Sequence, residues 1–290
     1  MHLNMCEVLE KARGFIMSNA RLLERRLYEV RFEGLSPEYA GRVVKAYQNP
    51  DGGLGHALEP DERCPSSQPL FVSFGLVAME EAGYRDTEFA LSLCDYLQSV
   101  ADENGLVSFF TENVFDYPVA GHWVNSTIAA GFNPTAEICG LLYYQGVEHE
   151  WLSKAAETCC DMFIKDPPDE AHALSCAARL AQYLPDRSKA ELMLDILAKV
   201  LPSARFFIPD APVNTYGLTP LHFAPMPDSI CRLLFTQRQI EGHLEDLLKQ
   251  QQPDGGWPVS WDAPGAASVL EWRGRVTLDA ICRLRAYNVI

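Results

Sequence analysis

Two carboxylates follow two copies of one sequence phrase at the same distance. Gln-Asn-Pro-Asp-Gly-Gly-Leu at 48–54 returns as Gln-Gln-Pro-Asp-Gly-Gly-Trp at 251–257. Glu59 lies six residues after the last glycine of the first copy, and Asp262 lies six residues after the last glycine of the second. Equivalent positions of a repeat occupy equivalent places in the fold. The spacing therefore predicts two carboxylates at one cavity mouth, where they act as general acid and general base.

The segment around Glu59 adds two more candidates for proton transfer. His56 and Glu59 make a histidine–carboxylate pair of the kind that is common in proton transfer. Asp61 follows Pro60, which keeps this segment extended and places Asp61 at the same cavity mouth. The predicted catalytic residues are Glu59, Asp61, Asp262 and His56. In the competing interpretation the acids cap helices or accept bonds from turn amides, and His56 bonds the backbone. The spacing matches no metal-binding signature, so we expect neither a metal nor a cofactor.

Large aromatic side chains occur in the predicted loops as well as in the helices. Loop rings can hold an isoprenoid and stabilise a carbocation over their π faces, and they can equally stack against a sugar ring. One cation, Arg273, is predicted to reach either the cavity or a turn carbonyl. The predicted substrate-binding residues are Trp261, Trp123, Phe109, Phe110, Tyr117 and Arg273.

The repeated phrase is typical of a turn, because Pro fixes φ, Asp bonds its own backbone and Gly adopts positive φ at little cost. A weaker relative, Gln98 followed by Asn104-Gly105-Leu106, begins 50 residues after the first copy. The last copy lies roughly four such steps from the first, and this period is typical of two-helix repeats. The chain of 290 residues therefore predicts about six helical hairpins, which can close into a ring.

Two kinds of helix are predicted to alternate along the chain. The first kind is charged and amphipathic and should form an outer ring, whereas the second is apolar nearly all round and should form a buried inner ring. The segment 206–228 contains five prolines and is predicted to hold a broken helix. Outer helices are expected at 37–47, 87–99, 149–164, 187–200 and 237–250, and inner helices at 69–82, 134–145, 170–183 and 269–287.

Composition indicates one globular domain over residues 1–290. Hydrophobic residues make up 48% and charged residues 22% of the chain, as in ordinary folded proteins. The net charge of −15 disfavours nucleic acid and anionic membranes as partners, because both require clustered Lys and Arg. We find neither a membrane-spanning apolar run nor a signal-peptide pattern, and nine scattered cysteines fit a reducing compartment, so we expect a cytoplasmic protein. The sequence does not indicate an oligomeric state.

The segment 250–257, Gln-Gln-Gln-Pro-Asp-Gly-Gly-Trp, resembles the QW-type repeat of triterpene cyclases and, more loosely, of protein prenyltransferase β subunits. The phrase at 48–54 is similar apart from the missing Trp, and the one at 98–106 is a faint relative. In that superfamily the Gln and Trp of each repeat tie the end of an outer helix to the turn. The resemblance implies an all-α fold, an α/α toroid with inner and outer helix rings.

The catalytic motifs of those families are missing from this sequence. It contains no D-x-D-D acid, no D-D-x-x-D string for magnesium diphosphate and no Asp-x-Cys zinc motif. The resemblance still implies a terpene cyclase-like lyase or isomerase, in which a carboxylic acid drives cyclisation or isomerisation of an apolar isoprenoid in a central aromatic cavity. One alternative is a carbohydrate-active toroid, a glycosidase, lyase or epimerase with paired carboxylates. The other is a non-enzymatic toroid that binds a ligand or a protein.

Overall fold

The structure is a computed structural model that describes residues 5–124 and 128–290. Regular structure in these ranges is helical, with isolated β-bridges and no strand, which confirms the predicted all-α class. None of the helices described there is both long and apolar enough to cross a membrane. The chain forms two compact units. Whether they act as the single predicted domain stays a prediction. Unit 1 comprises Met1–Ser36 and Phe206–Ile290, and unit 2 comprises Pro37–Arg205.

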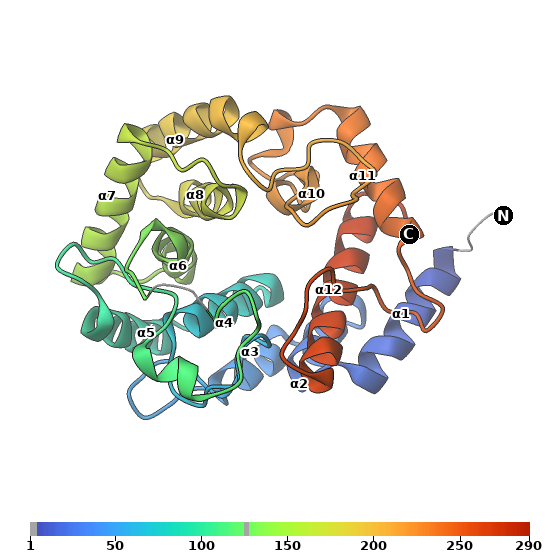
Figure 1. Ribbon diagram of the computed structural model, residues 1–290, viewed down its shortest axis with the longest axis horizontal. Helices are drawn as coiled ribbons and strands as arrows, with labels where there is room; N and C mark the ends of the chain where they lie inside the picture. The colour runs from blue at the N-terminus through green and yellow to red at the C-terminus, as the bar shows by residue number, and fades with distance from the viewer. Residues whose placement is uncertain (1–4, 125–127) are drawn as a thin grey trace. The chain divides into compact units, whose positions relative to one another are not determined.

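Unit 2 has two layers of helices (Figure 1). The inner helices α4, α6 and α8 pack side by side, α3 packs on α4, α5 and α7 on α6, and α9 on α8. Almost every side of α4 is buried, as its uncharged, small-residue sequence predicts. Each of these helices lies at a predicted position. Their bounds are α3 Pro37–Lys45, α4 Pro69–Ala82, α5 Thr87–Val100, α6 Phe132–Gln145, α7 Glu150–Lys165, α8 Ala171–Tyr183 and α9 Arg187–Val200, with short 3-10 helices at Glu112–Asp116 and Leu201–Ser203.

Unit 1 is built around its last helix, α12, which packs against α1, α2 and α11. The helices α1 and α2 were not among the predicted elements, although Val8, Ala12, Phe15 and Ile16 of α1 are buried at helical spacing. The expected broken helix is the single turn α10, preceded by a bridge between Phe207 and Leu218. The helices of unit 1 are α1 Met5–Asn19, α2 Leu22–Phe32, α10 Pro220–Phe223, α11 Gln237–Lys249 and α12 Ala266–Ala286, with a 3-10 helix at Arg232–Leu234.

The two full copies of the turn phrase fold in the same way. In the first, Gln48 Nε2 donates to the carbonyl of Gly52 at 2.9 Å, and in the second Gln251 Nε2 donates to the carbonyl of Gly255 at 3.0 Å. In each copy the Asp side chain accepts a hydrogen bond from the amide of the second glycine. The sequence repeat is therefore a repeat of hydrogen bonds.

Each turn phrase also docks onto an outer helix from the next part of the repeat. The glutamine of the first copy donates to Ser92 Oγ on α5 at 2.7 Å, and that of the last copy donates to the carbonyl of Val8 on α1 at 2.9 Å. In the middle copy the direction is reversed, because Trp151 of α7 donates to the carbonyl of Gly105 at 3.0 Å. The helix α1 thus accepts a hydrogen bond from the last turn phrase, as α5 does from the first.

Glycine is required in these turns for two reasons. The φ angles of Gly52 and Gly255 are +87° and +92°, which L side chains rarely adopt. A Cβ at Gly255 would lie 2.2 Å from the carbonyl oxygen of Lys11 on α1, and one at Gly52 would lie 2.8 Å from the carbonyl oxygen of Ser92 on α5. The close approach leaves room for no side chain.

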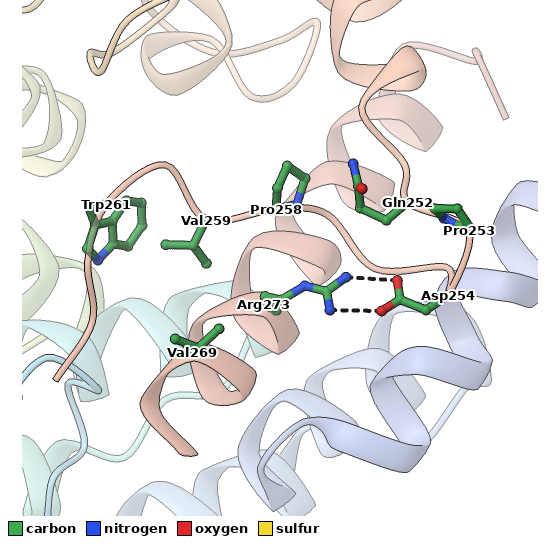
Figure 2. A pocket seen from close by; sticks show the side chains of 8 residues that line it. All are labelled: Gln252, Pro253, Asp254, Pro258, Val259, Trp261, Val269 and Arg273. Atoms are coloured by element: carbon green, nitrogen blue, oxygen red, sulfur yellow. Dashed lines mark hydrogen bonds and ion pairs between the residues drawn. The ribbon is translucent and has the colours of Figure 1, made fainter. Parts of the chain in front are cut away.

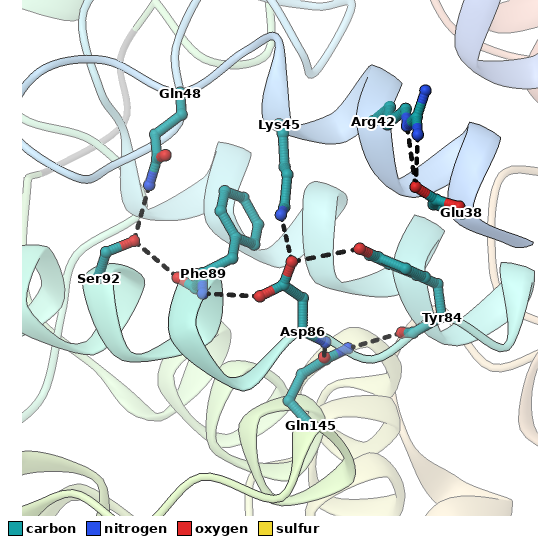
Figure 3. A network of polar contacts seen from close by, with 9 residues as sticks. All are labelled: Glu38, Arg42, Lys45, Gln48, Tyr84, Asp86, Phe89, Ser92 and Gln145. Carbon is teal, nitrogen blue, oxygen red and sulfur yellow. Dashed lines mark hydrogen bonds and ion pairs between the residues drawn. The ribbon is translucent and has the colours of Figure 1, made fainter.

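Asp86 joins helices α3, α5 and α6 of unit 2 at the start of α5 (Figure 3). Its carboxylate accepts from the amide of Phe89, from Tyr84 Oη and from Lys45 of α3. Its own amide donates to Gln145 Oε1 at the end of α6. The pKa of Asp86 is lowered, against the effect of burial, by the Lys45 ammonium and the Phe89 amide. This ionised N-cap fixes α5 against both neighbouring hairpins.

We predict that Gly255→Ala lowers the free energy of unfolding by at least about 2 kcal/mol, because the new side chain meets both positive φ and the α1 backbone. Gly242, inside α11, is the control: its Cβ would meet only Ala211 at 3.6 Å, so Gly242→Ala should be neutral or stabilising by up to about 1 kcal/mol. Urea unfolding measures both. Equal effects of the two substitutions would contradict a requirement for glycine at this turn.

Candidate functional site

The loop that follows the first turn phrase, residues 55–68, is closed upon itself. The amide of Ala57 donates to the carbonyl of Cys64, and that of His56 donates to the carbonyl of Pro65, both at 3.1 Å. His56 and Ala57 have φ of 59° and 58°, a conformation that costs free energy in non-glycine residues and is typical of tightly constrained loops. The His56 side chain is exposed, so it lies outside the buried part of this loop.

Three carboxylates are buried at the tip of this loop. Glu59 and Asp61 are each 3% exposed, and Glu62 is 0% exposed. Glu59 Oε2 accepts from the amide of Asp61 at 2.9 Å, which is the turn bond of the competing interpretation. Neither carboxyl oxygen of Glu62 has a hydrogen-bond partner among the described residues. Because buried polar groups are almost always bonded, this unpartnered carboxyl is the most unusual group in the loop.

Burial raises the pKa of Glu62 to about 9, and the negative charge of Asp61 adds to the effect. Removing water penalises the ionised carboxylate, and a neighbouring negative charge penalises it further. Glu62 is therefore a neutral carboxylic acid at physiological pH, with a proton to donate, beside a second carboxyl group. A carboxylic acid kept neutral by burial can act as a general acid.

A second loop, residues 117–123, covers the acids from the other side. The amide of Ala120 donates to the carbonyl of Asp61 at 2.8 Å, and Glu62 pairs with Val119 in an antiparallel bridge. Backbone hydrogen bonds thus hold Glu62 between two loops that are far apart in the sequence.

His122 on the second loop approaches the acid pair from solvent. Its Nε2 lies 3.5 Å from Asp61 Oδ2, and its side chain is 46% exposed whereas that of Asp61 is 4% exposed. His122 therefore lies between solvent and the buried side chain of Asp61.

Aromatic side chains form an apolar cluster next to the acids. The Trp123 ring lies 4.8 Å from that of Phe110, edge to face, and 5.3 Å from that of Phe109. Trp123 Nε1 is buried without a hydrogen-bond partner among the described residues. Cys64 and Val119, which flank the acids on the two loops, belong to the same cluster. The cluster comprises Cys64, Leu70, Phe110 and Val114, with Phe74, Phe109, Val119 and Trp123 packed against it.

Gln68, at the start of α4, connects two loops. One is the loop at 109–113, which carries Phe109 and Phe110, and the other is the loop at 55–68, called the acid loop below. Its Oε1 accepts from the amide of Thr111 at 2.7 Å, and its Nε2 donates to Asn113 Oδ1 at 3.0 Å. The amide of Leu70 adds a bond of 3.1 Å to the carbonyl of Phe109. The first helical turn of α4 therefore satisfies its free amides with the loop that carries the aromatic cluster.

The other predicted residues lie in unit 1 (Figure 2). Trp261 and Arg273 line a pocket of about 480 Å³. Arg273 forms a two-bond ion pair with Asp254, both bonds being 2.8 Å, and also donates to the carbonyl of Trp257, so the predicted bond to a turn carbonyl is present. Asp262 is exposed. Its predicted convergence with Glu59 and Asp61 stays a prediction, because it involves both units.

The rings of Phe109, Phe110 and Trp123 lie together, and Glu59 accepts from the amide of Asp61. His56 is exposed and Tyr117 is 40% exposed. That these residues form one substrate site stays a prediction. The residues that the sequence analysis missed are Glu62 and His122. One signal was available for each: three carboxylates within four residues at 59–62, and a histidine next to the aromatic Trp123. No group of three or more His, Cys, Asp or Glu side chains within 5–124 and 128–290 is placed to hold a metal ion.

Comparison with known proteins bears on the fold alone. No protein-family model matches the sequence, and no curated protein matches it. A crystal structure described as a protein from Actinoplanes is similar, with a TM-score of 0.59 and 15% sequence identity over 97% of this chain and 99% of that chain. At this identity the likeness extends to the course of the chain and not to its chemistry.

The raised pKa of Glu62 predicts a pH-dependent stability. The folded state keeps the proton up to about pH 9, whereas the unfolded state loses it near the ordinary value of 4.5. The free energy of unfolding is therefore not reduced by Glu62 ionisation below about pH 4.5, and it falls as the pH rises toward 9. Glu62→Gln removes this loss, so it should stabilise the protein by about 4 kcal/mol more at about pH 8 than at about pH 5.

Urea unfolding of both proteins at the two pH values measures this difference. Glu112→Gln, on the exposed 3-10 helix of the same unit, is the control and should change stability by less than about 0.5 kcal/mol at each pH. A stabilisation by Glu62→Gln that is the same at both pH values would show that Glu62 is ionised in the folded protein.

Proposed function

We propose that this chain is a proton-transfer enzyme, similar to terpenoid cyclases, that isomerises or cyclises an apolar isoprenoid. The observation that carries the proposal is Glu62, a buried neutral carboxylic acid without a hydrogen-bond partner among the described residues, next to Asp61 and an aromatic cluster. A group of this kind costs stability, and such costs are concentrated at functional sites. The missing D-x-D-D motif would then be replaced by Glu59, Asp61 and Glu62.

The acid and base roles follow from the environments of the two carboxyl groups. Glu62 breaks its O–H bond and gives the proton to one carbon of a substrate double bond, whose π electrons form the new C–H bond. Asp61 then removes a proton from a carbon next to the resulting cation, and the electrons of that C–H bond form the new double bond. The proton on Asp61 returns to Glu62, or it leaves to solvent while Glu62 takes up another from solvent, so that the reaction consumes no net proton.

The aromatic cluster supports an apolar substrate. Trp123 and Phe109 are only partly buried, and aromatic π faces stabilise positive charge that develops on a neighbouring carbon. A carbohydrate-active enzyme would need a wetter site with carboxylates open to a sugar and to water. The burial of Glu59, Asp61 and Glu62 favours the apolar substrate over the sugar at this site.

The proposed fold behind this site is an α/α toroid. The repeated Gln–Gly turn bonds and the docking of the last phrase onto α1 support it, because a ring requires the last repeat to be followed by the first. The same glutamine bonds support the resemblance to QW-type repeats. We further propose that the protein works in the cytoplasm, in keeping with its free cysteines.

Deuterium incorporation from D2O tests the proposed reaction. The protein is incubated in D2O with a panel of linear and cyclic unsaturated isoprenoids, and the products are analysed by mass spectrometry. We expect at least one substrate to gain deuterium at carbon, and Glu62→Gln to slow this by at least about a thousandfold, because an amide cannot donate the proton. Glu112→Gln should retain full activity. Exchange that is unaffected by Glu62→Gln would overturn the assignment of the acid.

A further inference from the structure

The pocket of unit 1 has a chemistry different from that of the acid site. We propose that it binds a neutral pyranose sugar, held between the Trp261 ring and the Asp254–Arg273 ion pair (Figure 2). Its volume of about 480 Å³ lies within the range of small-molecule pockets. The proposal concerns a second site and does not rest on the function proposed for Glu62.

The Trp261 ring is fixed in orientation before any ligand arrives. Trp272 contacts it edge to face with ring centres 4.9 Å apart, and Tyr216 does so at 6.3 Å. Edge-to-face contacts stabilise a single orientation of an aromatic side chain. The C–H face of a pyranose packs against such a ring, and Val259 and Val269 provide further apolar walls.

The other end of the pocket is polar without a net charge. Arg273 uses three N–H groups, two for Asp254 and one for the carbonyl of Trp257. A guanidinium has five, so two donors remain without an acceptor in the described part of the chain. The Asp254 side chain is 51% exposed and can accept a further hydrogen bond. Donors and an acceptor side by side match a hydroxyl group, which both donates and accepts.

The ion pair also excludes the competing ligands. An anion would find the charge of Arg273 already neutralised by Asp254, and a hydrocarbon would strip water from these polar groups without replacing its hydrogen bonds. The pair cannot swing away from the pocket, because Arg273 lies 4.4 Å above the ring of Phe15 and Asp254 accepts from the amide of Gly256. A rigid pair of this kind orders a ligand at low entropic cost.

Fluorine NMR tests the proposal in the intact protein. The chain has five tryptophans, so labelling with 5-fluorotryptophan gives five signals, and Trp261→Phe identifies that of Trp261. Cellobiose, maltose, lactose and N,N′-diacetylchitobiose are titrated into the millimolar range. At least one should shift the Trp261 signal saturably while the signal of Trp151, buried in unit 2, stays unchanged.

Substitutions on the pocket wall separate this site from others. Val269→Arg fills the pocket from a 37% exposed position, and Leu233→Arg, at a 94% exposed position of the same unit, is its matched control. We expect the first to abolish the shift and the second to leave it unchanged, with the Trp257 signal reporting that unit 1 is folded. Trp261→Ala should weaken the affinity measured by calorimetry by at least about fivefold.

Three results would overturn the proposal: no sugar of the panel shifts the Trp261 signal saturably, the shift survives Val269→Arg, or geraniol shifts it where no sugar does. Glu62→Gln should leave sugar binding unchanged. Loss of activity at Glu62 and loss of binding at Trp261 are therefore distinguishable outcomes.

Discussion

The close contact between each turn glycine and an outer helix is the constraint on which the rest of the structure depends. At Gly255 the α1 backbone is so near that only a hydrogen atom fits, and the neighbouring glutamine bonds the same helix. Such a contact fixes both the turn and the distance between successive helices. It also explains why the phrase is repeated almost unchanged at opposite ends of the sequence: the geometry of the contact tolerates little variation in its residues.

Hydrogen bonds from the first turn phrase fix the acid loop, residues 55–68. Asp51 accepts from Ser67 Oγ at 2.7 Å and Asn49 donates to the carbonyl of Pro65 at 3.0 Å. These bonds tie the C-terminal end of the loop to the turn from which the loop starts. With its ends fixed, the loop can hold strained backbone at His56 and a desolvated acid at Glu62. The free energy needed to bury Glu62 comes from the surrounding hydrogen bonds and from the aromatic cluster.

Much of the fold could be predicted from the sequence, because helical periodicity and turn chemistry are local properties. The positions of α3 to α9, α11 and α12 follow from them. The helices α1 and α2 were missed, although the buried residues of α1 recur at helical spacing. Both helices pack against α12 at the other end of the chain. Local patterns contain no information about such partners.

The candidate site, too, could be predicted only in part from the sequence. Equal spacing from the turn glycines led to Glu59, whose carboxylate bonds a turn amide, and not to Glu62, which carries the unusual chemistry. What distinguishes these two glutamates is the loop at 117–123, which pairs with Glu62 and is some 57 residues away in the sequence, counted from Glu62 to Val119. Desolvation is a tertiary property, so a pKa raised by burial cannot be inferred from the spacing of acids alone.

Direct titration of the Glu62 carboxyl tests the central claim of this account. Carbon NMR of protein labelled at the glutamate carboxyl, with Glu62→Gln to assign the signal, follows its protonation as the pH is raised. The account predicts a protonated carboxyl at neutral pH and a midpoint near the pKa of about 9 that burial beside Asp61 produces. A midpoint close to the ordinary value of 4.5 would show that Glu62 is an ionised side chain, and the proton donor of the proposed reaction would be lost.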